Sequence, residues 1–189
     1  MLAKPGIQER VYAIRIGGTA PLLMHAPNGL GEKKLAKGVI PSAEEECEAA
    51  LYRNADGQIV VPARCIEGAF VKAGSSKVAA GQGKKTYKQF ILAGTQVAPE
   101  EPLLISEKYI IDSRRVVIAR AGIIRRRPRF EKWAVEFDLK VFDPYLLQEG
   151  MTTQLREILE NAGALVGLLD YRPRFGRFIV TKFEIKSEK

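Results

Sequence analysis

The sequence predicts one α+β domain in which helices cover one face of a sheet. Three observations predict it. The length of 189 residues is enough for a single domain with its own core. Some segments alternate apolar and polar residues as half-buried strands do, while others repeat apolar residues every three to four positions as helices do. These strand and helix patterns are interspersed along the whole chain, residues 1–189.

The first strand is expected at residues 9–17, where apolar side chains occupy alternate positions. A loop rich in Gly, Pro and Lys follows at residues 18–41 and is predicted to be mobile. Ser42 and Glu45 have the spacing of a capping box, in which each side chain binds the other's backbone N–H. A helix is therefore expected from Ser42 to about Tyr52.

Turn residues at 54–57 separate this helix from a short strand expected at residues 59–61. Pro62 suits the first turn of a second helix, because that position needs no backbone N–H donor. The apolar stripe of this helix ends at Ala73. Gly, Ser and Lys dominate residues 74–88, which predicts a second mobile loop.

Strands are then expected at residues 90–97, 103–105 and 109–119. The last of these could turn at Ala121 and Gly122 into a short returning strand, which would form an inserted hairpin. The clearest strand is at residues 133–142, because five apolar residues at every second position from Trp133 to Val141 alternate with Glu136, Asp138 and Lys140.

The strongest helix begins after Thr152 or Thr153, and its apolar residues from Leu155 to Val166 follow the 3.6-residue period. A loop leads from it into a last strand at residues 177–186. The order of these segments matches a ferredoxin-like β-α-β-β-α-β unit with an inserted hairpin, an extra helix and long loops. One face of such a sheet is open and could receive a chain-like ligand.

Positive charge is concentrated in two stretches of the chain. The net charge is +8, and residues 108–132 hold nine Lys or Arg against two acids. Residues 77–88 add four Lys and no acid. Such asymmetry attracts a polyanion. A merely soluble, solvated surface is the alternative, but Arg dominates here, and Arg binds phosphate in a forked geometry and stacks on bases.

The tetrapeptide Arg-Pro-Arg-Phe occurs twice, at residues 127–130 and 172–175. Proline favours extended backbone in the residue before it, which would splay the arginines beside an aromatic ring. Guanidinium and ring together suit single-stranded nucleic acid. In the alternative interpretation Phe130 and Phe175 are core residues. The residues predicted to contact nucleic acid are Lys84, Lys85, Lys88, Arg114, Arg115, Arg125, Arg126, Arg127, Arg129, Phe130, Arg172, Arg174 and Arg177.

The second tetrapeptide lies in a segment that we call the glycine–arginine loop (residues 167–178). Backbone N–H groups near Gly167 and Gly176 could approach a phosphate closely. The loop is not a P-loop, because it lacks the Gly-Lys-Ser/Thr ending and follows a helix. The alternative is a purely structural turn.

A loop of this kind between the last helix and last strand of a ferredoxin-like unit resembles the repeat-associated (RAMP) superfamily. Residues 162–185 carry most of the resemblance and residues 52–70 add to it, although the loop lacks the denser glycine pattern of typical members. The resemblance implies an RRM-like and RAMP-like fold that binds guide RNA or other single strands as part of a CRISPR effector backbone. RNA is then a more probable ligand than DNA, and a homo-oligomer or multi-subunit ribonucleoprotein is implied.

Two alternative functions remain open. His25 is the only histidine, and RAMP endoribonucleases often carry a catalytic His early in the chain, so a metal-independent endoribonuclease is one alternative. A lone His is usually structural, and no enzyme is expected. The stretch 162–185 also resembles small phage-type proteins of unknown function, so a protein-interaction module with a basic face is the other alternative.

No cofactor or metal is expected. Cys47 and Cys65 fall in predicted helices and are interpreted as small buried thiols of a reducing compartment. The sequence has no HExxH motif and no paired Cys spacing. No apolar run approaches the roughly 18 residues of a membrane helix, and the first residues lack the apolar region of a secretory signal. These features predict a cytoplasmic protein without membrane contact.

Overall fold

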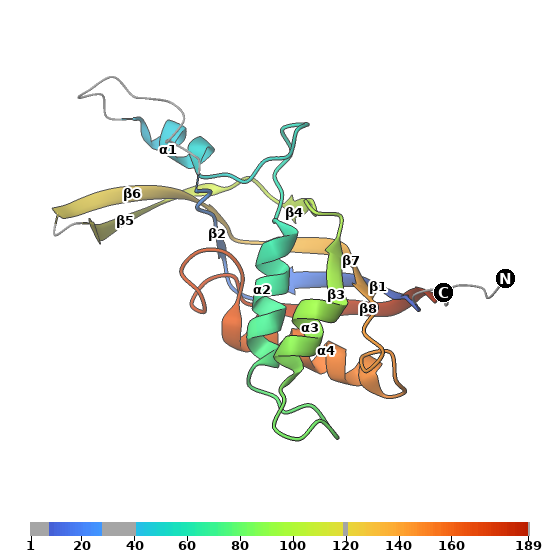
Figure 1. The fold of residues 1–189 in the computed structure, drawn as a ribbon. Helices are drawn as coiled ribbons and strands as arrows, with labels where there is room; N and C mark the ends of the chain where they lie inside the picture. Colours follow the sequence, from blue (N-terminus) through green and yellow to red (C-terminus); the bar gives the residue numbers. More distant parts are fainter. Residues whose placement is uncertain (1–7, 28–40, 119–120, 189) are drawn as a thin grey trace.

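The computed structural model describes residues 8–27, 41–118 and 121–188. The described elements and their arrangement are shown in Figure 1. In chain order they are β1 (Arg10–Gly18), β2 (Leu22–Leu23), α1 (Ala43–Ala49), α2 (Ala63–Gly74), α3 (Tyr87–Gly94), β3 (Thr95–Ala98), β4 (Leu104–Ser106), β5 (Ile110–Ile118), β6 (Ala121–Phe130), β7 (Trp133–Val141), α4 (Met151–Asn161), a π-helical turn η1 (Ala162–Val166) and β8 (Phe178–Glu188).

The main sheet is antiparallel, with strand order β3-β7-β1-β8 and with β4 also paired to β7. Its centre is β1, where Ile14 lies opposite Phe137 of β7 on one side and Phe183 of β8 on the other. α2 lies between β1 and β3 in the chain, and α4 lies between β7 and β8. The fold is therefore α+β and is compatible with the ferredoxin-like unit expected from the sequence.

Helices α2, α3 and α4 cover one face of this sheet and form the core with it (Figure 1). The largest fully buried side chains there include Tyr12, Phe70 and Tyr87. The opposite face carries charged residues in ion pairs, such as Arg15 with Glu136 at 2.7 Å. This open face therefore offers paired charges, and its described residues form no rows of exposed rings on which bases could stack.

A smaller sheet has the order β2-β6-β5, and its β5–β6 hairpin projects from the body (Figure 1). The predicted short hairpin is in fact long, with residues 119–120 at its tip outside the described part. Arg125, Arg126 and the first Arg-Pro-Arg-Phe lie within β6. Pro128 fits in this strand because the backbone N–H of Arg126 points away from β5 to Glu46, and the missing N–H of Pro128 would point the same way.

The prediction of a strand at residues 90–97 is wrong for most of these residues. Residues 87–94 form α3, and only β3 follows as strand. The cause is helical packing, since Tyr87 and Ile91 lie four residues apart and are both 1% exposed. The first helix also ends earlier than expected, at Ala49 instead of Tyr52.

The segments expected to be mobile loops contain ordered contacts where they are described. Residues 75–86 fold back on themselves through a hydrogen bond from the N–H of Tyr87 to the carbonyl of Lys77 at 3.0 Å. Ala79 in this segment is buried. In the other segment, β2 adds to the small sheet, while residues 28–40 lie outside the described part of the chain. No helix in the described ranges is long and apolar enough to span a membrane.

Candidate nucleic-acid interface

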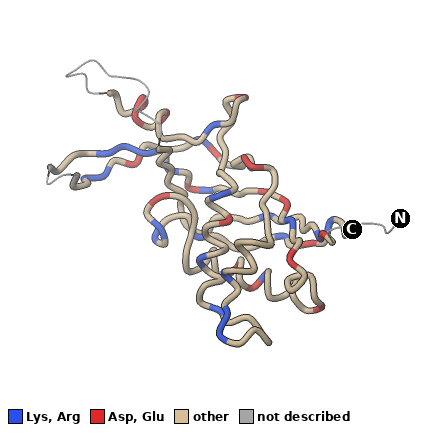
Figure 2. Tube along the Cα trace, in the orientation of Figure 1, with Lys and Arg blue, Asp and Glu red and all other residues tan. Residues whose placement is uncertain are grey.

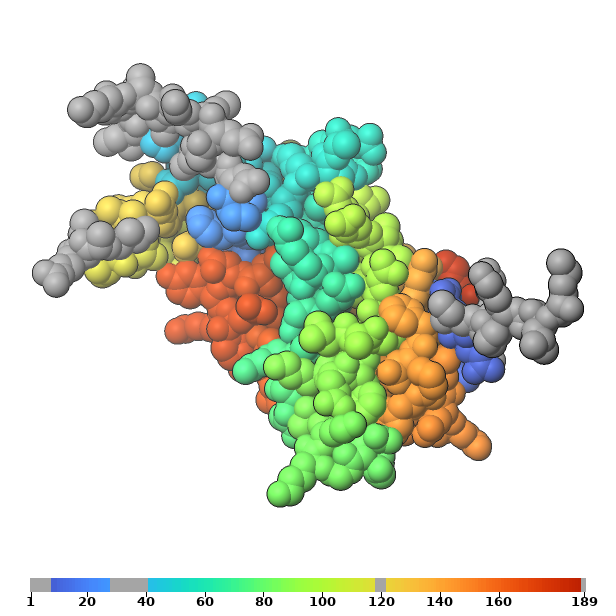
Figure 3. Space-filling model, viewed as in Figure 1, coloured from blue at the N-terminus to red at the C-terminus, as the bar shows by residue number. Residues whose placement is uncertain are grey.

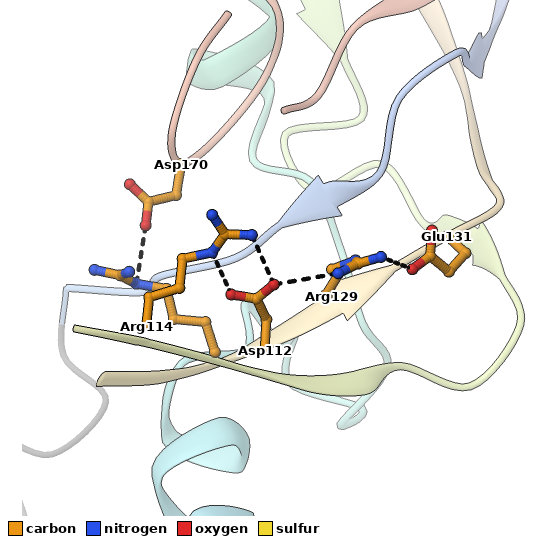
Figure 4. A network of polar contacts seen from close by, with 6 residues as sticks. Asp112, Arg114, Arg129, Glu131 and Asp170 are labelled. Atoms are coloured by element: carbon orange, nitrogen blue, oxygen red, sulfur yellow. Dashed lines mark hydrogen bonds and ion pairs between the residues drawn. The ribbon is translucent and has the colours of Figure 1, made fainter. Parts of the chain in front are cut away.

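Several arginines of the β5–β6 hairpin are paired with acids instead of being splayed toward solvent. Asp112 is 8% exposed, accepts hydrogen bonds from Arg114, including one at 2.9 Å, and binds Arg129 at 3.3 Å. Arg129 also bonds to Glu131, as Figure 4 shows. The hydrogen bonds from Arg114, and then those from Arg129, lower the pKa of the Asp112 carboxyl. These cations are thus largely neutralised within the hairpin.

Two hairpin arginines hold the glycine–arginine loop. Nε of Arg127 lies 2.9 Å from a carboxyl oxygen of Asp170, and its side chain is 10% exposed. The guanidinium of Arg127 lies 5.2 Å from the ring centre of Tyr171. The guanidinium of Arg114 lies 4.7 Å from that of Phe175. Cation–π contacts of this kind are attractive, so both arginines link the hairpin to the loop.

Arg125 and Arg126 of β6 form ion pairs with an acid of helix α1. Glu46 is 7% exposed, and its carboxylate lies 3.7 Å from Arg125 and 3.4 Å from Arg126. The predicted capping box of Ser42 and Glu45 starts this helix, with both hydrogen bonds present. The tri-arginine run is therefore held at three residues by acids from two different elements.

Neither phenylalanine of the repeated tetrapeptide is at the surface. Phe130 is 1% exposed and packs edge-on against Tyr109, with ring centres 5.9 Å apart. Phe175 is 6% exposed. Phe130 was predicted to contact nucleic acid; it is a core residue instead, because it lies opposite the buried Leu22 of β2. Tyr171, 39% exposed, is the surface ring of the loop and was missed by the sequence analysis.

The glycine–arginine loop is a tight turn and not an extended segment. The N–H of Phe175 donates to the carbonyl of Tyr171 at 3.1 Å, and the N–H of Gly176 donates to the carbonyl of Pro21 at 2.8 Å. Gly176 has a φ of +70°, and a Cβ there would lie 2.1 Å from the carbonyl oxygen of Leu168. Three arginines of the turn are exposed: Arg172, Arg174 and Arg177. They have no acid partner among the described residues.

A groove of about 810 Å³ runs between α2 and the segment formed by η1 and the glycine–arginine loop. Figure 3 shows these two walls side by side on the front of the molecule, α2 in teal and the loop in orange-red. The positive residues that line the groove are Arg64, Lys72 and Arg172. None of them pairs with an acid in the described residues. Its other lining includes Tyr52 and Leu169.

Arg64 and Lys72 were not among the residues predicted from the sequence to contact nucleic acid. Both lie on the face of α2 that also carries Gly68, at spacings of four residues. A Cβ at Gly68 would meet nothing within 4 Å, so this stretch of the groove is open. The sequence does show two cations eight residues apart on the polar side of a predicted helix. That these cations line a groove depends on the position of η1 opposite α2, which the sequence does not show.

His25 is exposed and lines the same groove. Desolvation by the atoms packed around it lowers the pKa of His25, and the positive charge of Arg127 lowers it further. The imidazole is therefore neutral near pH 7. No cluster of three metal-ligating side chains is present in the described ranges. Cys47 is buried as predicted, whereas Cys65 is only partly buried, in the groove wall.

The remaining predicted cations lie away from the groove. Lys84, Lys85 and Lys88 are exposed in and after the 75–86 segment, and Arg115 is exposed on the hairpin. Figure 2 shows positive segments on the projecting hairpin and others well apart from them at the bottom of the molecule. The fold therefore divides the predicted single basic face into a hairpin, a loop with its groove, and a lysine end.

No family model and no curated protein sequence matches this chain. Among solved structures, the fold is similar to a chain of one described as the cryo-EM structure of Type III-B Cmr-beta bound to cognate target RNA. The TM-score is 0.60 at 10% sequence identity, and the match covers 94% of this chain and 61% of that chain. This chain thus spans about three-fifths of the solved chain. At this identity the likeness shows that the two chains share a fold.

Proposed function

We propose that this chain is an RNA-binding subunit of a multi-subunit ribonucleoprotein and that it binds a single strand along the groove beside α2. The observation that supports this most is the set of cations, Arg64, Lys72 and Arg172, that line an open groove without acid partners. The similarity in fold to a chain from an RNA-bound complex points to RNA as the polyanion.

The groove suits a strand because its positive residues lie on two walls around apolar surface. Arg64 and Lys72 are eight residues apart on α2, which corresponds to about 12 Å at 1.5 Å per residue. They would therefore contact different phosphates, while Arg172 contacts the strand from the opposite wall. Tyr52 and Leu169 offer flat or apolar surface for bases. Such contacts depend little on base identity.

Two double variants test the position of the site. Arg64→Ala with Lys72→Ala removes the α2 wall of the groove, and Lys182→Ala with Lys186→Ala removes two exposed cations from the open sheet face. We expect the groove variant to lose at least tenfold in affinity for a single-stranded RNA, measured by fluorescence anisotropy. Its plot of log affinity against log salt should also become shallower by about 1.4, at about 0.7 per lost phosphate contact.

The sheet-face variant carries the same change in net charge, so a smaller effect there separates contact from long-range attraction. Equal losses in the two variants, with both folded, would contradict a groove site. A greater loss in the sheet-face variant would place the strand on the open face of the sheet.

Metal-independent RNA cleavage is the second candidate function, because His25 borders the groove and its neutral imidazole is the form that acts as a general base. We assign His25 no catalytic role in the proposed function. Incubation of a bound strand with chelator present distinguishes the two, since only the endoribonuclease produces shorter RNA.

A further inference from the structure

Helix α1 places a buried acid against the arginines of β6. Besides its ion pairs with Arg125 and Arg126, the Glu46 carboxylate accepts a hydrogen bond from the backbone N–H of Arg126 at 3.1 Å. Two guanidinium groups and one N–H thus converge on one carboxylate. Side chains and backbone groups of these kinds are what proteins use to bind a phosphate oxygen.

The carboxylate occupies an edge of β6 that has no strand beside it in the described ranges. β2 pairs with β6 only at Phe130 and Arg129, so the N–H of Arg126 lies beyond the last pair. An exposed N–H at a strand edge needs an acceptor. Glu46 supplies it here, and the side chains of Arg125 and Arg126 remain 35% and 31% exposed beside it.

α1 is a short helix whose stability depends on its contacts with other elements. It has seven residues, which is too short to be stable without tertiary packing. Besides Glu46, its contacts among the described residues include the buried thiol of Cys47 and hydrogen bonds to Glu48 of 2.6 Å from Tyr109 and 2.7 Å from Arg53. α1 therefore covers the arginines of β6 through contacts that a competing acidic group could replace.

We propose that Glu46 fills a phosphate-binding site on β6, and that a phosphate of the bound strand replaces it by lifting α1 off the hairpin. Arg125 and Arg126 then bind a phosphate of the nucleic-acid strand instead of the Glu46 carboxylate. The identity of the strand rests on the proposed function, but the displacement of α1 is a separate event at a separate place. It would extend the contact from the groove to the hairpin.

Labelling of the two native cysteines tests both ideas in the unaltered protein. The chain has two cysteines. Cys47 is 0% exposed in α1, and burial, followed by the charge of Glu46, raises the pKa of its thiol to about 11. Cys65 lines the groove. N-ethylmaleimide labelling of each, followed by peptide mass spectrometry, is measured with increasing amounts of a single-stranded RNA.

We expect the strand to accelerate labelling of Cys47 at least fivefold, because α1 lifts, and to slow labelling of Cys65, because the groove fills. Protection of Cys65 with an unchanged or slower rate at Cys47 overturns the displacement of α1 and leaves the groove site intact. Acceleration at Cys47 without protection of Cys65 supports the displacement and contradicts the groove. No change at either cysteine overturns both.

A pair of variants tests the role of the carboxylate itself. Glu46→Gln keeps the size of the side chain, and Glu44→Gln removes the same charge from an exposed position in the same helical turn. Glu46→Gln should bind the RNA at least threefold more tightly than Glu44→Gln, with a salt slope steeper by about 0.7 for each arginine released. Equal affinities in two folded variants overturn the proposal. If Glu46→Gln does not fold, the cysteine labelling of the unaltered protein decides.

Discussion

Replacing Arg127 by Ala separates a structural arginine from an RNA-binding one. Sequence reasoning placed Arg127 in the nucleic-acid surface, but its side chain is 10% exposed and lies against Asp170 and Tyr171. Breaking a fully buried ion pair from one side costs about 3 to 5 kcal/mol. Because the Asp170 side chain is 29% exposed, water partly compensates, and we expect about 2 to 3 kcal/mol.

For a domain of this size, that loss lowers the Tm by about 5 to 10 °C, since about 1 kcal/mol corresponds to 2 to 4 °C. The assay is thermal unfolding followed by circular dichroism, with Arg115→Ala as the matched control. Arg115 is exposed on the same hairpin, so its replacement should change stability by less than about 0.5 kcal/mol.

A double-mutant cycle completes the argument. Arg127→Ala and Asp170→Ala together should cost less than the sum of the single changes by about 1 to 2 kcal/mol, because they remove one shared contact. The reasoning is refuted if Arg127→Ala is as stable as Arg115→Ala and instead weakens RNA binding. Arg127 would then be a surface contact, as the sequence alone suggested.

Three further predictions concern the loop, acid stability and His25. Arg172→Ala with Arg174→Ala should weaken RNA binding with little change in Tm, whereas Phe175→Ala should cost about 3 to 5 kcal/mol as a buried ring; the reverse pattern would make the loop only a structural turn. Because Arg114 lowers the pKa of Asp112, this carboxyl stabilises the fold above its unfolded pKa and loses that contribution as pH falls through its folded pKa. Asp112→Asn should therefore flatten the fall of stability with acid in urea titrations, and an unchanged pH profile would argue against this pair. His25→Ala should leave RNA affinity within about twofold and the wild type should not cleave RNA in chelator; cleavage that His25→Ala abolishes would favour the endoribonuclease.

Local chemistry let the sequence determine part of this structure. The capping box at Ser42 and Glu45 depends on contacts three residues apart, and it is present. The alternation in β7 needs only that one side of a strand be buried, and Trp133 to Val141 follow it throughout. The apolar period of α4 is likewise a local property, and Leu155, Ile158 and Leu159 are buried as it predicts. The predicted Thr cap is wrong, because the helix begins at Met151 after Gly150. The end of the stripe is also wrong, because residues 162–166 form a π-helical turn in which Leu165 is 68% exposed.

Only the tertiary structure decided which charges are available. The net charge and the density of Arg in β6 are visible in the sequence, but two of the acids that neutralise these arginines come from far along the chain. Glu46 reaches Arg126 across 80 positions, and Asp170 reaches Arg127 from the other side of the hairpin. Pairing at such separations leaves no periodic pattern in the sequence. The number of hairpin arginines available to a ligand was therefore overestimated, and the cations of α2 that line the groove were not predicted.

The sheet register was also a tertiary decision. Strict alternation along β8 would place Ile179 and Phe183 on one face. In the structure the register shifts opposite Arg15 and Ile16, so Phe183 packs on Tyr12 at 4.8 Å while Ile179 is 55% exposed. A bulge of this kind reverses the faces of everything after it, and its position follows from the twist and packing of the partner strands. The sequence alone thus determines the kinds of elements and the excess of positive charge, whereas the packing of distant residues decides which arginines can meet a ligand.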